Sequence, residues 1–363
     1  SRRRHTRYGT VTGVQTCALP ILESLPDGFR FLRAAECSFA PGSDDVYVSP
    51  SQIRRFNLRN SDLVRGQVRA PKENERYFAL IKVERINDLD PDRAREKPLF
   101  DNLTPIWPRH RLRLEHRTDE TSTRMVDLFA PLGRGSRSLL VTPPRAGRTS
   151  LLQAIARGIA KNHPEVVLFK VLIGDRPEDI AESWAGTPGV LMATHADEPD
   201  ARHVQVAEMA IERAKRLVEG GQDVVVLLDS LSRLARAAQA AAPSSGRMTT
   251  GGWDPLALQK VRSVLGAARN LKEGGSLTVV GAVLTATGAR VDDVLLEELK
   301  GMENHQLTLD RGLADRRIYP ALDVPHCQVQ HEEHLWTPQQ FTDRKSTRLN
   351  SSHSSVSRMP SSA

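Results

Sequence analysis

From about residue 128 onward, short runs of almost uninterrupted apolar residues alternate with longer segments whose apolar residues recur at helical spacing, as in 151–159 and 204–217. A strand-length run without polar alternation predicts a β-strand that is buried on both faces. Such strands are typical of parallel sheets that are covered by helices on each side. The sequence therefore favours an α/β domain built on a parallel sheet. The predicted strands are 138–141, 166–173, 189–194, 223–229 and 276–284.

Residues 22–87 differ from this pattern. Their apolar residues come in short runs that are separated by turn signals such as Pro26-Asp27-Gly28 and Pro41-Gly42-Ser43. About five short strands in a segment of this length favour a small all-β barrel. A charged stretch begins at Asp88, and we expect 88–126 to be a linker, so that the parallel-sheet domain occupies 127–343.

The two ends of the chain, 1–21 and 344–363, lack apolar periodicity and resemble translated sequencing-adapter sequence. We expect both to be artefactual or disordered and leave them out of the fold, which implies that the natural chain is truncated at each end. The alternative is a basic tail that binds nucleic acid. The whole chain has 51 basic and 44 acidic residues, but eight of the basic ones lie in these ends, which leaves 43 against 44. The net charge of +7 is therefore no argument for a polyanionic partner.

Several classes of protein are excluded by composition. No apolar run approaches the ~18 residues that a membrane-spanning helix needs. The three cysteines lack zinc-ligand spacing, which argues against a zinc ribbon and against a disulfide scaffold. When Cys17 is set aside with the N-terminal end, Cys37 and Cys327 remain. Two distant cysteines in a long chain indicate a reducing, cytoplasmic location.

The segment from Val141 to Ser150 follows a predicted strand and opens a predicted helix, which is the position of a phosphate-binding loop. Of the pattern G-x-x-x-x-G-K-[ST], only Gly147 and Thr149 match, because Arg148 replaces the lysine. The alternative is an ordinary turn before a helix. We expect ATP to be bound by Thr142, Pro143, Pro144, Arg145, Ala146, Gly147, Arg148, Thr149 and Ser150.

Two carboxylates follow predicted strands. Asp229 ends the run 223–229, and a carboxylate at the tip of a buried parallel strand is where phosphate-loop enzymes hold Mg²⁺. We expect Asp229 and Thr149 to bind this ion, with an aspartate that caps the next turn as the alternative. Asp175 follows the strand 166–173, where enzymes of the RecA type place a water-activating acid.

Long runs of the sequence resemble the transcription termination factor Rho family. They are 44–59, 72–80, 202–237, 266–278 and 316–323, and the resemblance extends over 22–343. It implies an OB or cold-shock-like RNA-binding barrel followed by a RecA-type ATPase domain. It also implies a homohexamer that uses ATP and Mg²⁺ to move 5′-to-3′ along cytosine-rich RNA and to release transcripts from RNA polymerase. A ring ATPase of the rotary or secretion type shares the core fold and is an alternative.

The resemblance also implies site residues. Phe29 and Phe31 stand at i and i+2 and would share one strand face, where bases stack for ~1–3 kcal/mol each; the alternative is that both are core residues. Asp45 and Glu75 would accept hydrogen bonds from the exocyclic amine of cytosine. In the barrel, RNA contacts are implied for Phe29, Phe31, Arg33, Asp45, Tyr47, Glu75, Arg76 and Tyr77. In two pore loops, they are implied for Gly246, Arg247, Met248, Thr250, Gly288 and Arg290. At the ATPase site, the resemblance implies a catalytic role for Asp175, Arg176, Asp229 and Arg148, and adenine packing on Tyr319.

Three residues of the predicted ATPase site differ from the residues that the family has at the same positions. Arg148 stands where the family has lysine, and Asp175 is one methylene shorter than the family's glutamate. Gln330 aligns with the arginine finger, which is worth ~10³–10⁵ in turnover. When a catalytic group is displaced by ~1 Å, the reaction rate can fall ~10²-fold. The alternative function is therefore an RNA-binding and nucleotide-binding relative with impaired hydrolysis, which would be a regulator rather than a motor.

Overall fold

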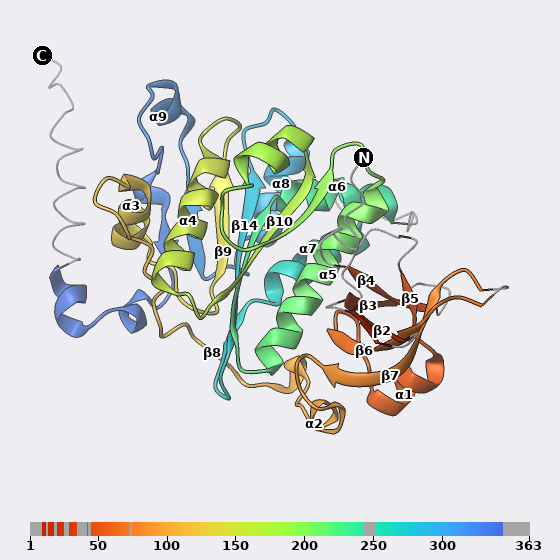
Figure 1. Cartoon of the computed structure of the whole chain (residues 1–363). Helices are drawn as coiled ribbons and strands as arrows, with labels where there is room; N and C mark the ends of the chain where they lie inside the picture. The colour runs from red at the N-terminus through yellow and green to blue at the C-terminus, as the bar shows by residue number, and fades with distance from the viewer. Residues whose placement is uncertain are drawn as a thin grey trace, which may run out of the picture.

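The computed structural model describes residues 9–11, 14–17, 20–24, 29–34, 42, 45–72, 75–242 and 252–343. These residues form two bodies that pack side by side, each built around its own sheet (Figure 1). The predicted pore-loop residues Gly246, Arg247, Met248 and Thr250 lie outside the described residues, as does the C-terminal segment 344–363. No helix in the described ranges is long and apolar enough to span a membrane.

The first sheet is the predicted small barrel. Its strand order is β1-β2-β6-β7-β5-β4-β3, and an antiparallel bridge between Ile21 and Leu63 joins the last strand to the start of β6, which closes the barrel. Buried Leu22, Leu32 and Val64 belong to the apolar cluster inside it. Its elements are β3 (Pro20–Ser24), β4 (Arg30–Ala34), β5 (Val46–Tyr47), α1 (Pro50–Phe56), β6 (Val64–Arg69) and β7 (Phe78–Ile86).

The barrel extends further towards the N-terminus than we expected. Strands β1 (Gly9–Val11) and β2 (Val14–Cys17) pair with each other, and β2 pairs with β6. Strand β3 begins at Pro20, and Ile21 is buried. The expectation that residues 1–21 lie outside the fold is wrong for 9–11, 14–17, 20 and 21, and the rest of that range lies outside the described residues. The segment lacks apolar periodicity, but its β-branched threonines and valines favour strands that gain their backbone hydrogen bonds from β6.

The second sheet is the predicted parallel sheet. Strands β11-β10-β12-β14-β9-β15 all pair in parallel, and β16 adds antiparallel to β15. The strands are β9 (Arg137–Thr142), β10 (Val167–Asp175), β11 (Val190–His195), β12 (Asp223–Asp229), β13 (Arg269–Leu271), β14 (Ser276–Leu284), β15 (His305–Thr308) and β16 (Gln328–Val329). All five strand predictions are thus confirmed.

Helices cover the two faces of this sheet. Successive residues of β12 are buried on opposite faces of the sheet. Val224 and Val226 belong to the apolar cluster on one side, and Val225 belongs to the cluster on the other. This double burial explains why the strand sequences are uninterrupted apolar runs. The helices are α3 (Thr121–Phe129), α4 (Arg148–Asn162), α5 (Asp200–Glu219), α6 (Leu231–Ala241), α7 (Pro255–Gly266), α8 (Arg290–Leu299) and α9 (Arg311–Asp315).

The segment predicted as a linker, 88–126, contributes to both domains, since Ala94 of its first helix packs against the apolar cluster of the barrel. It contains α2 (Pro91–Arg95), the short strand β8 (Pro105–Ile106) and the start of α3. Strand β8 pairs antiparallel with β13, so the chain enters the large sheet before the predicted boundary at residue 127. Two residues of strand carry too little periodicity to be recognised in a sequence.

Helix α5 connects the two bodies (Figure 1). At its last turn, the guanidinium of Arg59 in the barrel donates to both carboxylate oxygens of Glu219, at 2.9 and 2.6 Å. Glu219 also accepts from the backbone N–H of Phe100, at 2.9 Å, and pairs with Arg216. Its carboxylate is almost completely buried. One acid therefore holds the barrel, the linker and the helix together.

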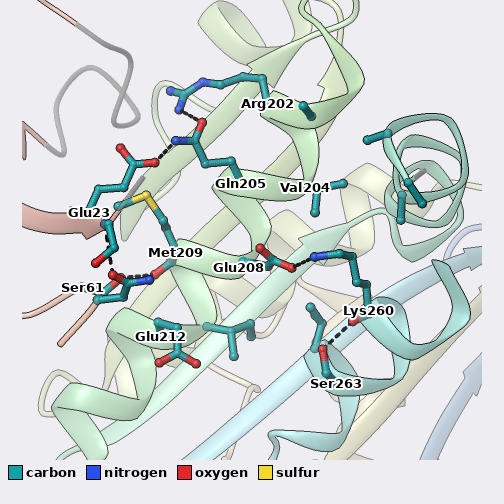
Figure 2. A pocket seen from close by; sticks show the side chains of 18 of the residues that line it. Glu23, Ser61, Arg202, Val204, Gln205, Glu208, Met209, Glu212, Lys260 and Ser263 are labelled. Carbon is teal, nitrogen blue, oxygen red and sulfur yellow. Dashed lines mark hydrogen bonds and ion pairs between the residues drawn. The ribbon is translucent and has the colours of Figure 1, made fainter. Parts of the chain in front are cut away.

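A cavity of about 1090 Å³ opens along this junction between the barrel and helices α5 and α7 (Figure 2). The Ser61 hydroxyl donates to the carbonyl of Met209 across it, at 3.1 Å, and the Gln205 amide donates to Glu23. Among the described residues, its lining includes none of the predicted ATP-binding residues. The cavity is thus a feature of the domain junction.

We predict that Glu219→Ala destabilises the protein by about 3–5 kcal/mol, because it leaves Arg59 and the N–H of Phe100 without their buried partner. Urea unfolding of the full chain measures the change. Glu297→Ala is the matched control, because Glu297 forms an exposed pair with Lys300 and should cost less than about 0.5 kcal/mol. Equal effects of the two variants would contradict the junction role of Glu219.

Candidate functional site

The predicted phosphate loop lies between β9 and α4, at the edge where the parallel strands end. Gly147 caps α4 with φ of +91°, a left-handed conformation that glycine adopts without strain. The backbone N–H groups of Arg148, Thr149 and Ser150, at the start of α4, donate to no acceptor among the described residues. Such unsatisfied donors at a helix N-terminus suit phosphate oxygens. In the loop, Thr142, Pro143 and Ala146 are buried, and Pro144 and Arg145 are exposed.

Two side chains from the C-terminal part of the chain reach this loop. Arg311 donates to the carbonyl oxygen of Pro144, at 2.6 Å. Tyr319 is 58% exposed, and its ring carbons lie 3.5 Å from where a Cβ on Gly147 would stand. The ring therefore covers the glycine and offers an open face. The packing of adenine on Tyr319 stays a prediction. The contact of Arg311 was not predicted, because nothing near it in sequence marks it as a loop partner.

Asp229 ends β12 and is completely buried. The Nε atom of Arg148 lies 2.9 Å from its Oδ1 and 3.1 Å from its Oδ2. Burial raises the pKa of the Asp229 carboxyl, and the neighbouring Arg148 guanidinium opposes that rise. The residue that replaces the family's lysine is thus the direct partner of the predicted metal ligand.

Asp175 ends β10 and is also buried. It forms an ion pair with Arg233 of α6, whose guanidinium also donates to the carbonyl of Ile173, at 3.2 Å. Arg176, next in the chain, is exposed. Sequence reasoning missed Arg233. The available signal was its position four residues after Asp229, on the first turn of the helix that follows β12.

The donor types at this edge suit Mg²⁺, since a carboxylate and a hydroxyl are the ligands that this ion prefers. However, both carboxylate oxygens of Asp229 lie within 3.1 Å of the Nε atom of Arg148, so neither of them is free of that guanidinium. A divalent cation there would face the guanidinium of Arg148 across the same carboxylate. In this arrangement the residues Thr149 and Asp229 do not fit a magnesium ion.

The barrel carries the predicted aromatic surface. The rings of Phe29 and Tyr47 lie 6.3 Å apart, and that of Phe31 lies 6.0 Å from Tyr47 and 4.9 Å from Tyr77. Phe29 is 53% exposed, whereas Phe31 is only 8% exposed. The expectation that both phenylalanines are exposed is wrong for Phe31, because the two tyrosines pack against its ring. Phe29, Tyr47 and Tyr77 keep open surface for a base.

The charged barrel residues are already paired with one another. Arg33 forms buried ion pairs with Glu23 and, at 3.3 Å, with Asp45. Glu75 is exposed and accepts two hydrogen bonds from Arg69, which lower the pKa of its carboxyl to about 2. A carboxylate with so low a pKa stays ionised and remains an acceptor at neutral pH. The exposed Arg76 lies over the ring of Tyr77.

The predicted pore-loop residues Gly288 and Arg290 and the predicted finger position Gln330 lie at opposite ends of the strands of the large sheet. Gly288 and Arg290 are exposed and follow the carboxyl end of β14, so they share the edge of the phosphate loop. Gln330 is exposed and follows β16, whose Val329 pairs with His305 at the start of β15. The start of β15 belongs to the opposite edge. Within one chain, the structure therefore does not bring Gln330 to the nucleotide site.

An aromatic-faced barrel joined to a parallel sheet with a phosphate loop defines an RNA-binding protein with a RecA-type nucleotide-binding domain. Residues 20–92 match the model of the Rho termination factor RNA-binding domain. Residues 122–328 match the nucleotide-binding domain of the ATP synthase alpha/beta family. Two solved structures share the fold at TM-score 0.56. One is an ATPase of a type III secretion system (24% identity, 61% of this chain and 64% of that chain). The other is the ATP synthase subunit NeqB (18% identity, 67% and 61%).

Curated relatives cover most of the chain. Transcription termination factor Rho of Chromobacterium violaceum is 51% identical over 326 residues, which are 89% of this chain and 78% of that protein. Rho of Pseudomonas fluorescens is 52% identical (87% and 76%), and Rho of Escherichia coli K12 is 51% identical (88% and 77%). The chain belongs to the transcription termination factor Rho family. The predicted fold class and family, with RNA and a nucleotide as ligands, are thereby confirmed.

We predict that Phe29→Ala weakens the binding of single-stranded RNA about 5- to 100-fold, because it removes one stacking surface worth ~1–3 kcal/mol. Fluorescence anisotropy with a labelled oligocytidine measures the affinity. Leu256→Ala on α7 is the control, since Leu256 is similarly exposed but lies in the other domain. An unchanged affinity of Phe29→Ala would remove Phe29 from the RNA site.

Proposed function

We propose that this chain acts as a termination factor of the Rho family. It binds single-stranded, cytosine-rich RNA on the barrel through the aromatic surface of Phe29, Tyr47 and Tyr77 and the exposed acceptor of Glu75. Asp45 is buried against Arg33 and would have to open this pair to accept from a base. It assembles as a homohexamer, hydrolyses ATP, moves 5′-to-3′ along RNA and releases the transcript from RNA polymerase in the bacterial cytoplasm. The proposal rests mainly on one observation: the same chain contains a Rho-type RNA-binding barrel and a nucleotide-binding domain of the ATP synthase type.

Helix α5 supports a coupling between the two ligands. Its last turn holds the barrel through Glu219. Near its first turn, the ring of His203 hydrogen-bonds to Thr194 at 2.7 Å, and the same hydroxyl accepts from the N–H of Gly174, at 3.0 Å. Gly174 directly precedes Asp175. A shift of the barrel on binding RNA would therefore reach the nucleotide edge through one rigid helix.

The position of Gln330 supports assembly into a ring. A finger residue at the edge opposite the phosphate loop can act only on the nucleotide of a neighbouring subunit. The exposed Gly288 and Arg290, near the carboxyl end of β14, would line the pore together with Gly246, Arg247, Met248 and Thr250. Arginine in such loops suits phosphate contacts along a strand of RNA.

A second candidate function is a protein that binds RNA and nucleotide but hydrolyses little or nothing. The ion pairs Arg148–Asp229 and Asp175–Arg233 favour it, because they engage both carboxylates that would serve hydrolysis. Turnover that depends on Mg²⁺, with Thr149 and Asp229 as its ligands and Arg176 nearby, would require Arg148 to leave Asp229. Glutamine at position 330 also supplies no charge to a neighbouring site.

The two candidates differ in turnover. We expect the termination factor to hydrolyse ATP at about 1 s⁻¹ or faster, an ordinary enzyme rate, when polycytidylic acid is added. A phosphate-release assay with and without RNA measures this rate. No turnover with both ligands bound would establish the second candidate. The variant Arg148→Lys, Asp175→Glu, Gln330→Arg should then restore hydrolysis. Failure to bind either ligand would contradict both candidates.

A further inference from the structure

The guanidinium of Arg148 has two sides with different surroundings. Its Nε side faces the buried carboxylate of Asp229, at 2.9 and 3.1 Å. Its two Nη groups donate to no described residue, and the side chain keeps 17% of its surface exposed. Arg148 is the first residue of α4, and the backbone N–H groups of residues 148–150 donate to no acceptor among the described residues. The side chain thus links the buried acid to the place where phosphate is expected.

We propose that this site binds the polyphosphate of a nucleoside di- or triphosphate without a divalent cation, with Arg148 supplying the positive charge between the phosphates and Asp229. The inference rests on the nucleotide binding in the proposed function and concerns the bound state only. Thr149 and the N–H groups of Arg148 and Ser150 would hold the phosphate oxygens.

Arginine is suited to this bridge and lysine is not. The guanidinium carries five donors in a planar fork, so it can donate to Asp229 through Nε and still present both Nη groups to one phosphate. It is also charged at every accessible pH. A lysine ammonium is a point charge and would leave the two oxygens of Asp229 more open to a cation. With arginine instead of lysine at position 148, the positive charge beside Asp229 comes from the protein and not from a metal ion.

The carboxylate of Asp175, the other acid at this edge, is not available as a second ligand for a cation. Asp175 is buried and paired with Arg233, whose guanidinium also donates to the carbonyl of Ile173. The two arginines thus balance the two acids at this edge. Mg²⁺ gives up its hydration water reluctantly and usually binds through carboxylates together with substrate phosphates. Displacing an arginine from a fully buried aspartate adds a further cost to its binding.

The test measures nucleotide affinity of the full chain with N-methylanthraniloyl-ADP and -ATP, in Mg²⁺ and in EDTA. We expect the affinity of the wild-type protein to change by less than about 3-fold when Mg²⁺ is removed. Arg148→Lys should weaken at least about 10-fold in EDTA and recover in Mg²⁺. Arg157→Lys is the matched control, because Arg157 lies on the same helix but pairs with Glu120, away from the loop. It should behave as the wild type does.

A second readout uses Mn²⁺ without nucleotide, followed by electron paramagnetic resonance. The wild-type protein should bind no Mn²⁺ at this edge, and Arg148→Ala should gain a site by releasing Asp229. A 10-fold or larger loss of wild-type nucleotide affinity in EDTA would overturn the inference and leave the proposed function intact. Absence of nucleotide binding in both buffers would overturn the inference together with the nucleotide part of the proposed function.

Discussion

The burial of a parallel sheet between two layers of helices is the constraint on which the rest of this structure depends. Strands that are covered on both faces must pair along their whole length, because no water is available to their backbone groups. Parallel pairing then brings the carboxyl ends of β9, β10 and β12 to one edge. Thr142, Asp175 and Asp229 meet there although they are separated by long stretches of sequence. The nucleotide site is a consequence of how the core is buried.

The same helices that cover the sheet also carry the RNA-binding barrel. Helix α5 packs apolar residues on the sheet and presents Glu219 to Arg59 of the barrel at its end. A buried carboxylate that accepts from a guanidinium and from a backbone N–H fixes the relative position of the two bodies. The junction is therefore polar and directional, whereas each body is held internally by apolar packing. Motion at the barrel would be transmitted along the helix.

Charge at the nucleotide edge is balanced within the protein. Asp229 is paired with Arg148, and Asp175 with Arg233. A buried carboxylate needs a positive partner, and either a metal ion or an arginine can provide it. The exchange of the family's lysine for arginine at position 148 thus alters more than one side chain, because it decides which cation the aspartate meets. The residues at 148 and 175, which both differ from those of the family, each take part in one of these two ion pairs.

Much of the fold was determined by the sequence itself. The five apolar runs gave the strands of the large sheet, the position of Gly147 after a strand placed the phosphate loop, and long runs identified the family. These signals are local, since periodicity and loop position are properties of neighbouring residues. Only the tertiary structure decided which partners these residues meet: the pairing of Arg148 with Asp229 and of Arg233 with Asp175, the burial of Phe31 under two tyrosines, the addition of β1 and β2 to β6, and the place of Gln330 at the far edge. Each of these contacts joins distant parts of the chain, and no local pattern encodes which distant side chain will fill a given space.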